Sequence, residues 1–265
     1  MESREILFYY AIKYEGDFNK IYEAIHDKEE INLEEAQKVI SSNKNNYITI
    51  LDEEYPESLR NGYKAPFVLF YHGDISLLSD QRNKIAVVGS RKNSEYGKEM
   101  TEKLVKGICK DFVIVSGLAL GIDAIAHRTC IENGGKTIAV LGNGINFHYL
   151  EDNKDIFEEC KKNHLIISEY PDMVPPKPEC FPIRNRIIAG LCNSLLVTEG
   201  KIHSGTQITA FLMVQKSGDV CCVPTRAGED SICNHLIKEG AFLVETVEDI
   251  YQCVGVVPRK PVFEN

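Results

Sequence analysis

Three apolar runs that each end in a glycine turn leave few folds open to this chain. They are KIAVVGSR (84–91), FVIVSGLALGID (112–123) and TIAVLGNG (137–144). Continuous apolar runs of this length are typical of strands that are buried on both faces of a parallel sheet. A tight turn from such a strand into a helix presents backbone N–H groups and a helix N-terminus to an anion. The runs therefore predict a parallel sheet with a phosphate-binding edge.

Strand and helix patterns alternate from residue 84 onward, which indicates an α/β fold whose parallel sheet is covered on both faces. We expect strands at 84–88, 112–115, 137–141, 165–168, 194–198, 219–223 and 241–244. We expect helices at about 95–110, 121–134, 153–162, 183–192, 205–217, 231–239 and 246–253. In such folds ligands bind beyond the carboxyl ends of the strands, which is where the glycine turns lie.

The first part of the chain has a different pattern. Apolar residues recur at three- and four-residue spacing through residues 1–45, which predicts helices, and a short strand pattern follows at 67–74. The segment 75–83 is polar enough to be a connection. We therefore predict a helical N-terminal domain (1–75), a Rossmann-like domain (76–255) and a tail (256–265).

The net charge of the 265 residues is −9 at pH 7, and it is unevenly spread. Residues 1–75 carry a net charge of −7, and the remaining residues carry only −2. The total argues against nucleic acid as a partner. A local basic groove in the nearly neutral part is still compatible with one, because the local field decides binding.

Nine cysteines include no Cys-x-x-Cys pair, and most lie within predicted helices or strands. We expect buried thiols and no metal site. The N-terminus has no basic region followed by an apolar core, and no apolar run approaches the ~18 residues that span a membrane. These features predict a soluble, cytoplasmic protein without a membrane partner.

Small residues and an arginine follow the predicted strands at one edge of the sheet. These candidate phosphate-binding residues are Gly89, Ser90, Arg91, Ser116, Gly117, Gly121, Asp123, Ser204, Gly205 and Thr206. Glycine permits close backbone approach, and arginine can bind a phosphate with two hydrogen bonds. Ordinary strand–helix turns and helix N-caps explain the same residues without a ligand. The turns match neither the dinucleotide fingerprint nor the P-loop, so the sequence predicts no cofactor.

The segment FPIRNRIIAGL places two arginines one residue apart near a predicted helix start. They project in different directions, so we expect one of them to face a ligand. We predict that Arg184 does so, because it lies closer to the helix start, and that Arg186 pairs with Glu169 or Glu199. Phe181 either stacks on a base or belongs to the core.

Two pairs of side chains permit a catalytic interpretation beside a structural one. Asp123 and His127 lie four residues apart on one helical face, as an acid–base pair or as a local contact that ties down the loop. Glu169 and Glu199 both follow strands, and they either converge for hydrolysis or orient an arginine. We favour the structural interpretation of both pairs.

Seven motifs in a fixed order resemble those of one known family. They are IAVVGSR, VSGLALGIDAIAH, TIAVLGNGI, SEYP, FPIRNRIIAGL, SGTQITA and NHLIKEGAFLV. Together they resemble the DNA-processing protein A (Smf) family of bacterial recombination mediators, from roughly Tyr55 to Val244. One departure is Pro224-Thr225, where family members usually have Pro-Gly.

The resemblance implies an extended Rossmann-like, doubly wound domain that binds single-stranded DNA. It also implies a homodimer that loads the RecA recombinase during natural transformation. The family's DNA-binding positions fall on Gly89, Ser90, Arg91, Ser116, Gly117, Gly121, Asp123, Phe181, Arg184, Asn185 and Arg186, with Lys177 a nearby candidate. Its self-association face falls within 232–244, where we expect Leu236, Ile237, Phe242 and Val244 to form the interface.

Two other functions compete with DNA binding. The first is an enzyme on a small nucleotide, because related Rossmann-like phosphoribohydrolases of the Lonely Guy family carry Pro-Gly-Gly-x-Gly-Thr-x-x-Glu. Here Gly205-Thr206-Gln207-Ile208 is followed by Thr209, so the glutamate of that motif is missing and we expect no catalytic residues. The second is a sensor of a nucleotide-derived ligand that uses the same phosphate turns.

Overall fold

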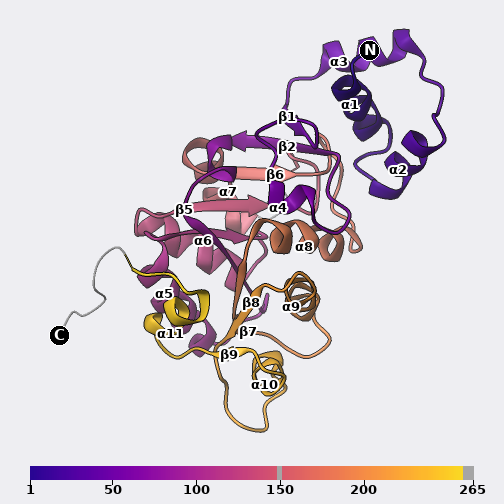
Figure 1. The fold of residues 1–265 in the computed structure, drawn as a ribbon. Coiled ribbons are helices and arrows are strands. Elements are labelled where there is room, and N and C mark those ends of the chain that lie inside the picture. Colours follow the sequence, from indigo (N-terminus) through magenta and orange to yellow (C-terminus); the bar gives the residue numbers. More distant parts are fainter. Residues whose placement is uncertain (148–150, 259–265) are drawn as a thin grey trace.

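The computed structural model describes residues 1–147 and 151–258 (Figure 1). Within these residues one nine-stranded sheet has the order β1-β2-β6-β5-β4-β3-β7-β8-β9. The strands are β1 (Asn46–Thr49), β2 (Val68–Gly73), β3 (Asn83–Gly89), β4 (Phe112–Ser116), β5 (Lys136–Val140), β6 (Leu165–Ser168), β7 (Ser194–Glu199), β8 (Asp219–Cys222) and β9 (Phe242–Leu243). Strands β3 to β9 pair in parallel, and β2 and β1 add an antiparallel edge. The predicted α/β fold with a mostly parallel sheet is confirmed.

Helices cover both faces of the sheet (Figure 1). They are α1 (Ser3–Lys13), α2 (Phe18–His26), α3 (Leu33–Ser42), α4 (Glu57–Arg60), α5 (Glu95–Ile108), α6 (Ile122–Glu132), α7 (Lys154–Asn163), α8 (Cys180–Leu191), α9 (Gly205–Gln215), α10 (Ile232–Lys238) and α11 (Val247–Val254). Ala86 and Val88 pack with α8, α9 and α10, whereas Ile85 and Val87 pack with α5, α6 and α11. Because successive strand side chains alternate between faces, burial on both sides explains the continuous apolar runs.

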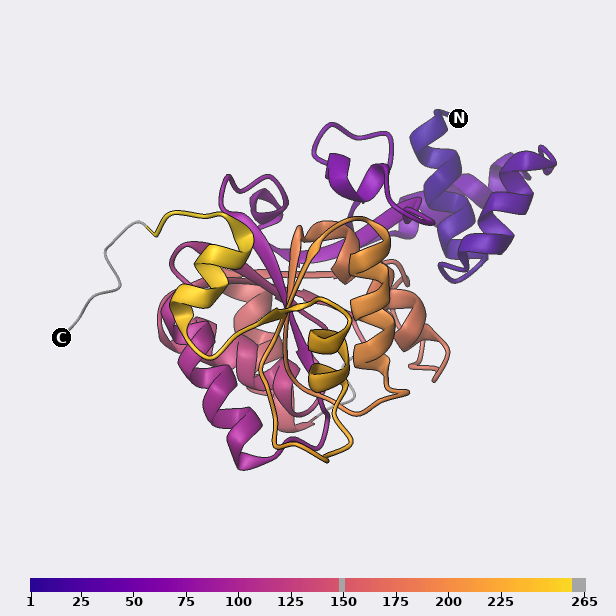
Figure 2. The same ribbon diagram turned by 60° about the horizontal axis from the view of Figure 1, so that its bottom comes forward.

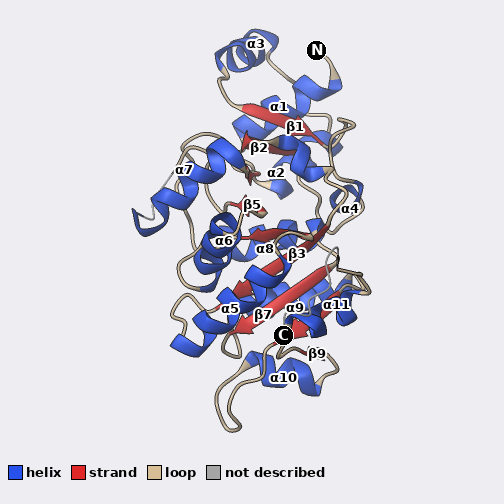
Figure 3. Ribbon diagram, turned by 90° about the vertical axis from the view of Figure 1, so that its left-hand side faces the viewer, coloured by secondary structure: helices blue, strands red, loops and turns tan. Residues whose placement is uncertain are grey.

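The sheet extends past the domain boundary that we predict near residue 75. The strand expected at 67–74 is β2, and it pairs antiparallel with β6 instead of belonging to a separate helical domain. Its partner β1 adds the outermost strand at that edge. The helices α1 to α3 stand at this end of the molecule, where Figure 2 shows them in indigo, and α10 lies at the other end (Figure 3). The helical segment is attached through α1, whose Phe8 ring stacks on Tyr47 of β1 at 4.3 Å between centroids.

One cysteine pair departs from the prediction of thiols throughout. Cys221 of β8 and Cys253 of α11 form a disulfide, and the other seven cysteines are free and buried. The packing of α11 on the sheet brings together two residues that are 32 apart in the chain. None of the helices among the described residues is long and apolar enough to cross a membrane.

A buried histidine couples this fold to pH. His127 of α6 is fully buried, and its Nδ1 lies 2.7 Å from the hydroxyl of Thr137, which donates its own hydrogen to the carbonyl of Ile114. The imidazole therefore donates from Nδ1, and Nε2 has no hydrogen-bond partner within the described residues. Burial lowers the pKa of His127 to about 3, because the charged ring would lose its hydration.

We expect the free energy of unfolding to fall as the pH drops from about 6.5 toward 3. In this window the unfolded chain binds a proton that the folded His127 does not, and one such proton costs about 1.4 kcal/mol per pH unit. Urea denaturation at pH 7 and pH 4.5 measures this slope. His127→Gln cannot titrate, so its slope should be shallower than that of the wild type; an unchanged slope would assign the effect to other groups.

Candidate nucleic-acid interface

A cavity of about 490 Å³ opens beyond the carboxyl ends of β3 and β7, between α8 and the start of α9. We call it the strand-end cavity. Ten predicted site residues line it: Gly89, Ser90, Arg91, Asp123, Phe181, Arg184, Asn185, Ser204, Gly205 and Thr206. Five others do not: Ser116, Gly117, Gly121, Lys177 and Arg186. The alternation of strands and helices thus brings four separate segments to one place.

The turn after β3 is held by backbone bonds and presents its arginine. The Ser90 N–H donates to the carbonyl of Glu199 at 2.9 Å, and the Ser90 carbonyl accepts from the N–H of Ile122 at 3.1 Å. Because the Ser90 N–H already donates to a carbonyl, it is not available to a phosphate, which the sequence-based prediction of a phosphate-binding turn requires. The Arg91 side chain is exposed, and its guanidinium carbon lies 5.1 Å from the centroid of the Phe181 ring. Such a contact orients the guanidinium while leaving its N–H groups accessible.

Phe181 lies between this arginine and the glycine turn that follows β5. A Cβ added at Gly142 would lie 2.9 Å from Cδ1 of Phe181, so only glycine admits the ring there without a shift. The ring is partly buried and lines the strand-end cavity. Part of Phe181 therefore packs against the turn, and part of it faces the cavity.

Arg184 is buried in the wall of the strand-end cavity. Its side chain is only 4% exposed, and Nη1 donates to the carbonyls of Gly117 (2.7 Å) and Val140. These carbonyls follow β4 and end β5, so one guanidinium ties two strand ends to α8. A Cβ at Gly117 would lie 2.4 Å from Nη2 of Arg184, which explains the glycine at that turn.

The remaining residues of the second turn support the cavity without lining it. Ser116 is fully buried and donates to the carbonyl of Val87 at 2.6 Å. A Cβ on Gly121, whose φ is +77°, would lie 2.2 Å from the carbonyl oxygen of Ser90. We therefore revise the predicted role of Ser116, Gly117 and Gly121 from phosphate contact to close packing of the turns.

Asp123 anchors the loop after β4. One carboxylate oxygen accepts from the backbone N–H of Gly117 (3.2 Å) and of Ala119 (3.4 Å). Burial raises the pKa of Asp123, while the positive charge of Arg184 and these backbone donors oppose the rise. His127 bonds Thr137 instead. The pair therefore shares no hydrogen bond within the described residues, and Asp123 ties down the loop by itself.

Arg186 forms the ion pair that the sequence suggests. Its Nη1 and Nη2 donate to the two carboxylate oxygens of Glu169 at 2.8 and 2.6 Å, and both side chains are buried. Glu199 has a different partner, since it accepts from the backbone N–H and hydroxyl of Ser94 at 2.9 and 2.8 Å. The two carboxylates are thus engaged separately, and Arg186 is withdrawn from the strand-end cavity.

The start of α9 contributes a helix N-terminus. Ser204 is its N-cap residue, but the hydroxyl donates to the carbonyl of Lys201 at 2.6 Å and does not cap the helix. Gly205 and Thr206 begin the helix on the wall of the cavity. The side-chain amide of Asn185 donates a hydrogen bond to the carbonyl of Gly205 at 3.3 Å. An anion in this cavity would meet the positive end of an 11-residue helix.

Lys201 is a cavity residue that our sequence analysis misses. It is exposed and lines the strand-end cavity with Arg91. The signal that points to it is its position directly after Glu199-Gly200, at the end of the strand next to β3. Within the described residues no cluster of three or more metal-binding side chains is found.

A family model described as DNA recombination-mediator protein A matches residues 46–255. The chain belongs to this family. The match spans both antiparallel edge strands and the whole parallel sheet. It therefore places the N-terminal helices α1 to α3 outside the matched region.

Relatives and solved structures of this family agree with the match. DNA processing protein DprA of Streptococcus pneumoniae is 44% identical over 204 residues, which are 76% of this chain and 72% of the relative. The Bacillus subtilis relative is 39% identical over 210 residues, 78% of this chain and 70% of its own. A solved S. pneumoniae structure has a TM-score of 0.78 at 39% identity, covering 88% of this chain and 80% of that one.

A second solved structure concerns the single-stranded DNA binding mode of DNA processing protein A from Helicobacter pylori. It is similar to this chain with a TM-score of 0.72 at 27% identity, and it covers 80% of this chain and 96% of that one. The fold of these two solved structures is thus shared over at least 80% of this chain.

The predicted dimer face needs a correction. Leu236 and Val244 are buried in the core of the protomer, packed with α9 and α11 respectively, so they are not available at a surface. Phe242 is 50% exposed and Leu243 47% exposed on β9 at the end of the sheet, and Ile237 is partly buried. The apolar surface in this region therefore comes from Phe242 and Leu243.

We expect Arg91→Ala to weaken binding of a single-stranded oligonucleotide by about 1.5–3 kcal/mol, because an exposed charged donor at the cavity is lost. The melting temperature should stay close to that of the wild type, since Arg91 is exposed. Fluorescence anisotropy with labelled oligo-dT measures the affinity. Lys92→Ala is the matched control, because Lys92 is an exposed neighbour that does not line the cavity. Equal affinities for both variants and the wild type would remove Arg91 from the site.

Proposed function

We propose that this chain binds single-stranded DNA in the strand-end cavity and acts as a recombination mediator in the cytoplasm. The observation that carries the proposal is the cavity itself. Two exposed cations, Arg91 and Lys201, line the cavity together with the partly exposed ring of Phe181 and the N-terminus of α9. Cations and helix N–H groups bind phosphates, and an aromatic face stacks on a base, which is how single strands are held. Family membership and the H. pylori structure support the same function.

The cavity offers no feature for reading a base sequence in a duplex. Most of the residues that line it come from strand ends, loops and the first turns of helices, and α9 contributes its N-terminal turns rather than a full face. Phosphate contacts and stacking carry little sequence information. We therefore infer that recognition is largely independent of sequence.

The competing enzyme and sensor functions are less well supported. Thr209 occupies the position where the phosphoribohydrolase motif has its glutamate, and its hydroxyl donates to the carbonyl of Gly205 at 3.3 Å. Of the two candidate carboxylates, Glu169 is neutralised by Arg186, and Glu199 holds the start of α5 through Ser94. The side chains offered for nucleotide hydrolysis therefore have structural partners.

Single-stranded oligo-dT should bind more tightly than duplex DNA of equal length, and the affinity should fall steeply with salt because bound phosphates release counterions. Anisotropy titrations over a salt series measure both effects. ADP-ribose and mononucleotides, added in parallel, should not displace the oligonucleotide. Equal affinity for the duplex, or an affinity that ignores salt, would contradict the proposal, and displacement by ADP-ribose would favour the sensor.

We also propose, on the resemblance to the family, that the chain forms a homodimer and loads RecA during natural transformation. Phe242 and Leu243 give β9 an exposed apolar edge, which a second copy can cover symmetrically. A dimer would place two strand-end cavities on one particle, so a long strand would bind more tightly than a short one. The RecA step is tested by whether the wild type speeds RecA filament growth on single-stranded DNA.

Phe242→Asp should produce a monomer that still binds short oligo-dT but loses the advantage for long oligo-dT. Sedimentation at tens of micromolar gives the oligomeric state, and anisotropy gives the affinities. Phe211→Asp is the matched control, since Phe211 is 51% exposed on α9 and lies outside the predicted face. A wild-type monomer, or a monomeric variant with undiminished affinity for long strands, would contradict the dimer.

A further inference from the structure

A second cavity, of about 450 Å³, lies on the other side of the start of α8. We call it the helix-side cavity. Its walls come from the α1–α2 turn with the start of α2, the segment before β2, the segment after β6, and the helices α8 and α9. Pro182 lines both this cavity and the strand-end cavity. A DNA strand that leaves the strand-end cavity over the first turn of α8 would therefore enter the helix-side cavity.

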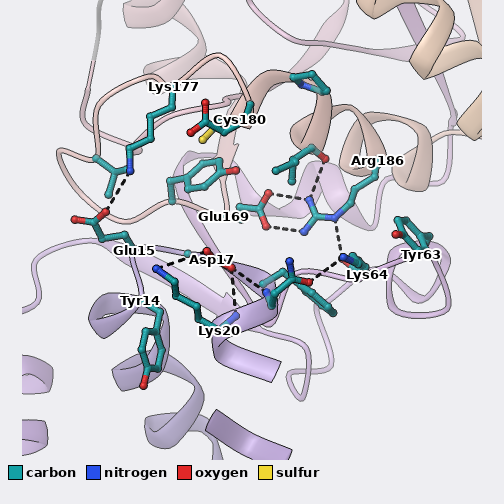
Figure 4. A pocket seen from close by; sticks show the side chains of 18 of the residues that line it. Tyr14, Glu15, Asp17, Lys20, Tyr63, Lys64, Glu169, Lys177, Cys180 and Arg186 are labelled. Atoms are coloured by element: carbon teal, nitrogen blue, oxygen red, sulfur yellow. Dashed lines mark hydrogen bonds and ion pairs between the residues drawn. The ribbon is translucent and has the colours of Figure 1, made fainter. Parts of the chain in front are cut away.

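Tyr63 and Lys64 form one wall of the helix-side cavity (Figure 4). Tyr63 is 69% exposed, the highest value among the tyrosines and phenylalanines that the structure describes. The Lys64 ammonium lies 5.7 Å from the Tyr63 ring and 5.5 Å from the Phe18 ring. An accessible ring beside a cation suits a ligand that combines a flat base with a negative charge.

The position of Lys64 is fixed by the buried ion pair. The Arg186 Nε donates to the carbonyl of Lys64 at 3.0 Å while the same guanidinium binds Glu169 (Figure 4). The backbone of Lys64 has a φ of +49°, a conformation that residues other than glycine seldom adopt. The buried pair thus holds Lys64 at the wall of the cavity in an otherwise unfavourable conformation.

Most charged side chains that line this cavity are paired, and within the described residues Lys64 and Glu179 are the two that form no ion pair. Lys177 lies 3.6 Å from Glu15, on the opposite side of the cavity in Figure 4, and Lys20 lies 3.9 Å from Asp17. The Lys64 ammonium instead donates to the neutral side chain of Asn19 at 2.9 Å and forms no ion pair within the described residues. This cavity therefore offers one phosphate-binding cation and a stacking ring, rather than a strongly basic groove.

We infer that the helix-side cavity holds the next part of the same DNA strand, with a base stacked on Tyr63 and a phosphate near Lys64. The inference rests on the proposed function, because it extends the path of the strand that Arg91 binds. The acidic N-terminal helices are then part of the DNA-binding surface, through α2 and the α1–α2 turn. Stacking needs no net positive charge, which reconciles this role with their acidity.

The absence of tryptophan from the chain provides a direct test. Tyr63→Trp is then the single fluorophore of its kind, and its emission should be quenched by oligo-dT of about 15 nucleotides when a base stacks on it. Leu33→Trp is the control, because Leu33 is 59% exposed on α3 of the same segment and does not line the cavity. Equal quenching of both variants, or none in Tyr63→Trp, would overturn the inference. Quenching by free dTMP at similar concentrations would also overturn it, in favour of a mononucleotide site.

Affinity measurements separate this inference from the proposed function. Tyr63→Ala should weaken binding of the ~15-nucleotide strand on the order of tenfold, with an unchanged salt slope, because stacking releases no counterions. Lys64→Gln should reduce the slope of log affinity against log salt concentration by about 1, which corresponds to the loss of one phosphate contact. Lys28→Gln is its control, since Lys28 is exposed with a similar φ of +52° and lies outside the cavity.

Strand length distinguishes the two cavities. Tyr63→Ala and Lys64→Gln should leave the affinity for oligo-dT of about 4 nucleotides unchanged, since such a strand can be held by the strand-end cavity alone. Arg91→Ala should weaken both lengths. If Arg91→Ala acts and the Tyr63 and Lys64 variants match the wild type at both lengths, the helix-side inference fails and the proposed function stands. If the wild type binds oligo-dT of neither length, the proposed function itself fails.

Discussion

Two buried guanidinium groups on α8 hold the carboxyl edge of the sheet together. Arg184 binds the carbonyls of Gly117 and Val140, and Arg186 binds both oxygens of Glu169 and the carbonyl of Lys64. A buried charge is costly unless its hydrogen bonds are satisfied, so each guanidinium is stable only with these partners in place. The ends of β4, β5 and β6 and the segment before β2 are therefore fixed relative to α8.

This arrangement divides the basic residues into two groups with different tasks. The buried arginines shape the cavities, whereas Arg91 and Lys201 are exposed and Lys64 is partly exposed, so these three are the cations that we propose for ligand binding. Gly117 has a structural task of the same kind, because a Cβ at this position would collide with the guanidinium of Arg184. The net charge of the chain says little about its partner, since a few positioned cations and rings can bind a strand on an acidic protein.

The buried ion pair also joins the N-terminal helices to the sheet. A Cβ at Gly16, in the α1–α2 turn, would lie 2.4 Å from the carbonyl oxygen of Glu169, so the turn packs directly on the residue that binds Arg186. Lys64 and Phe18 meet at the same place, where the ammonium lies over the ring at 5.5 Å. The helical segment is thus positioned by the same ion pair that lines the helix-side cavity.

The sequence by itself determined the parallel sheet, the order of its strands and helices along the chain, and the family, because apolar periodicity and motif order are local properties. It also suggested the pairing of Arg186 with Glu169. The tertiary structure decided the rest: the antiparallel strands β1 and β2 at the edge, the burial of Arg184 and Ser116, the burial of Leu236 and Val244, and the place of Lys201. The physical reason is that a guanidinium faces a carbonyl or solvent according to which distant segments pack around it, and no local pattern records those neighbours.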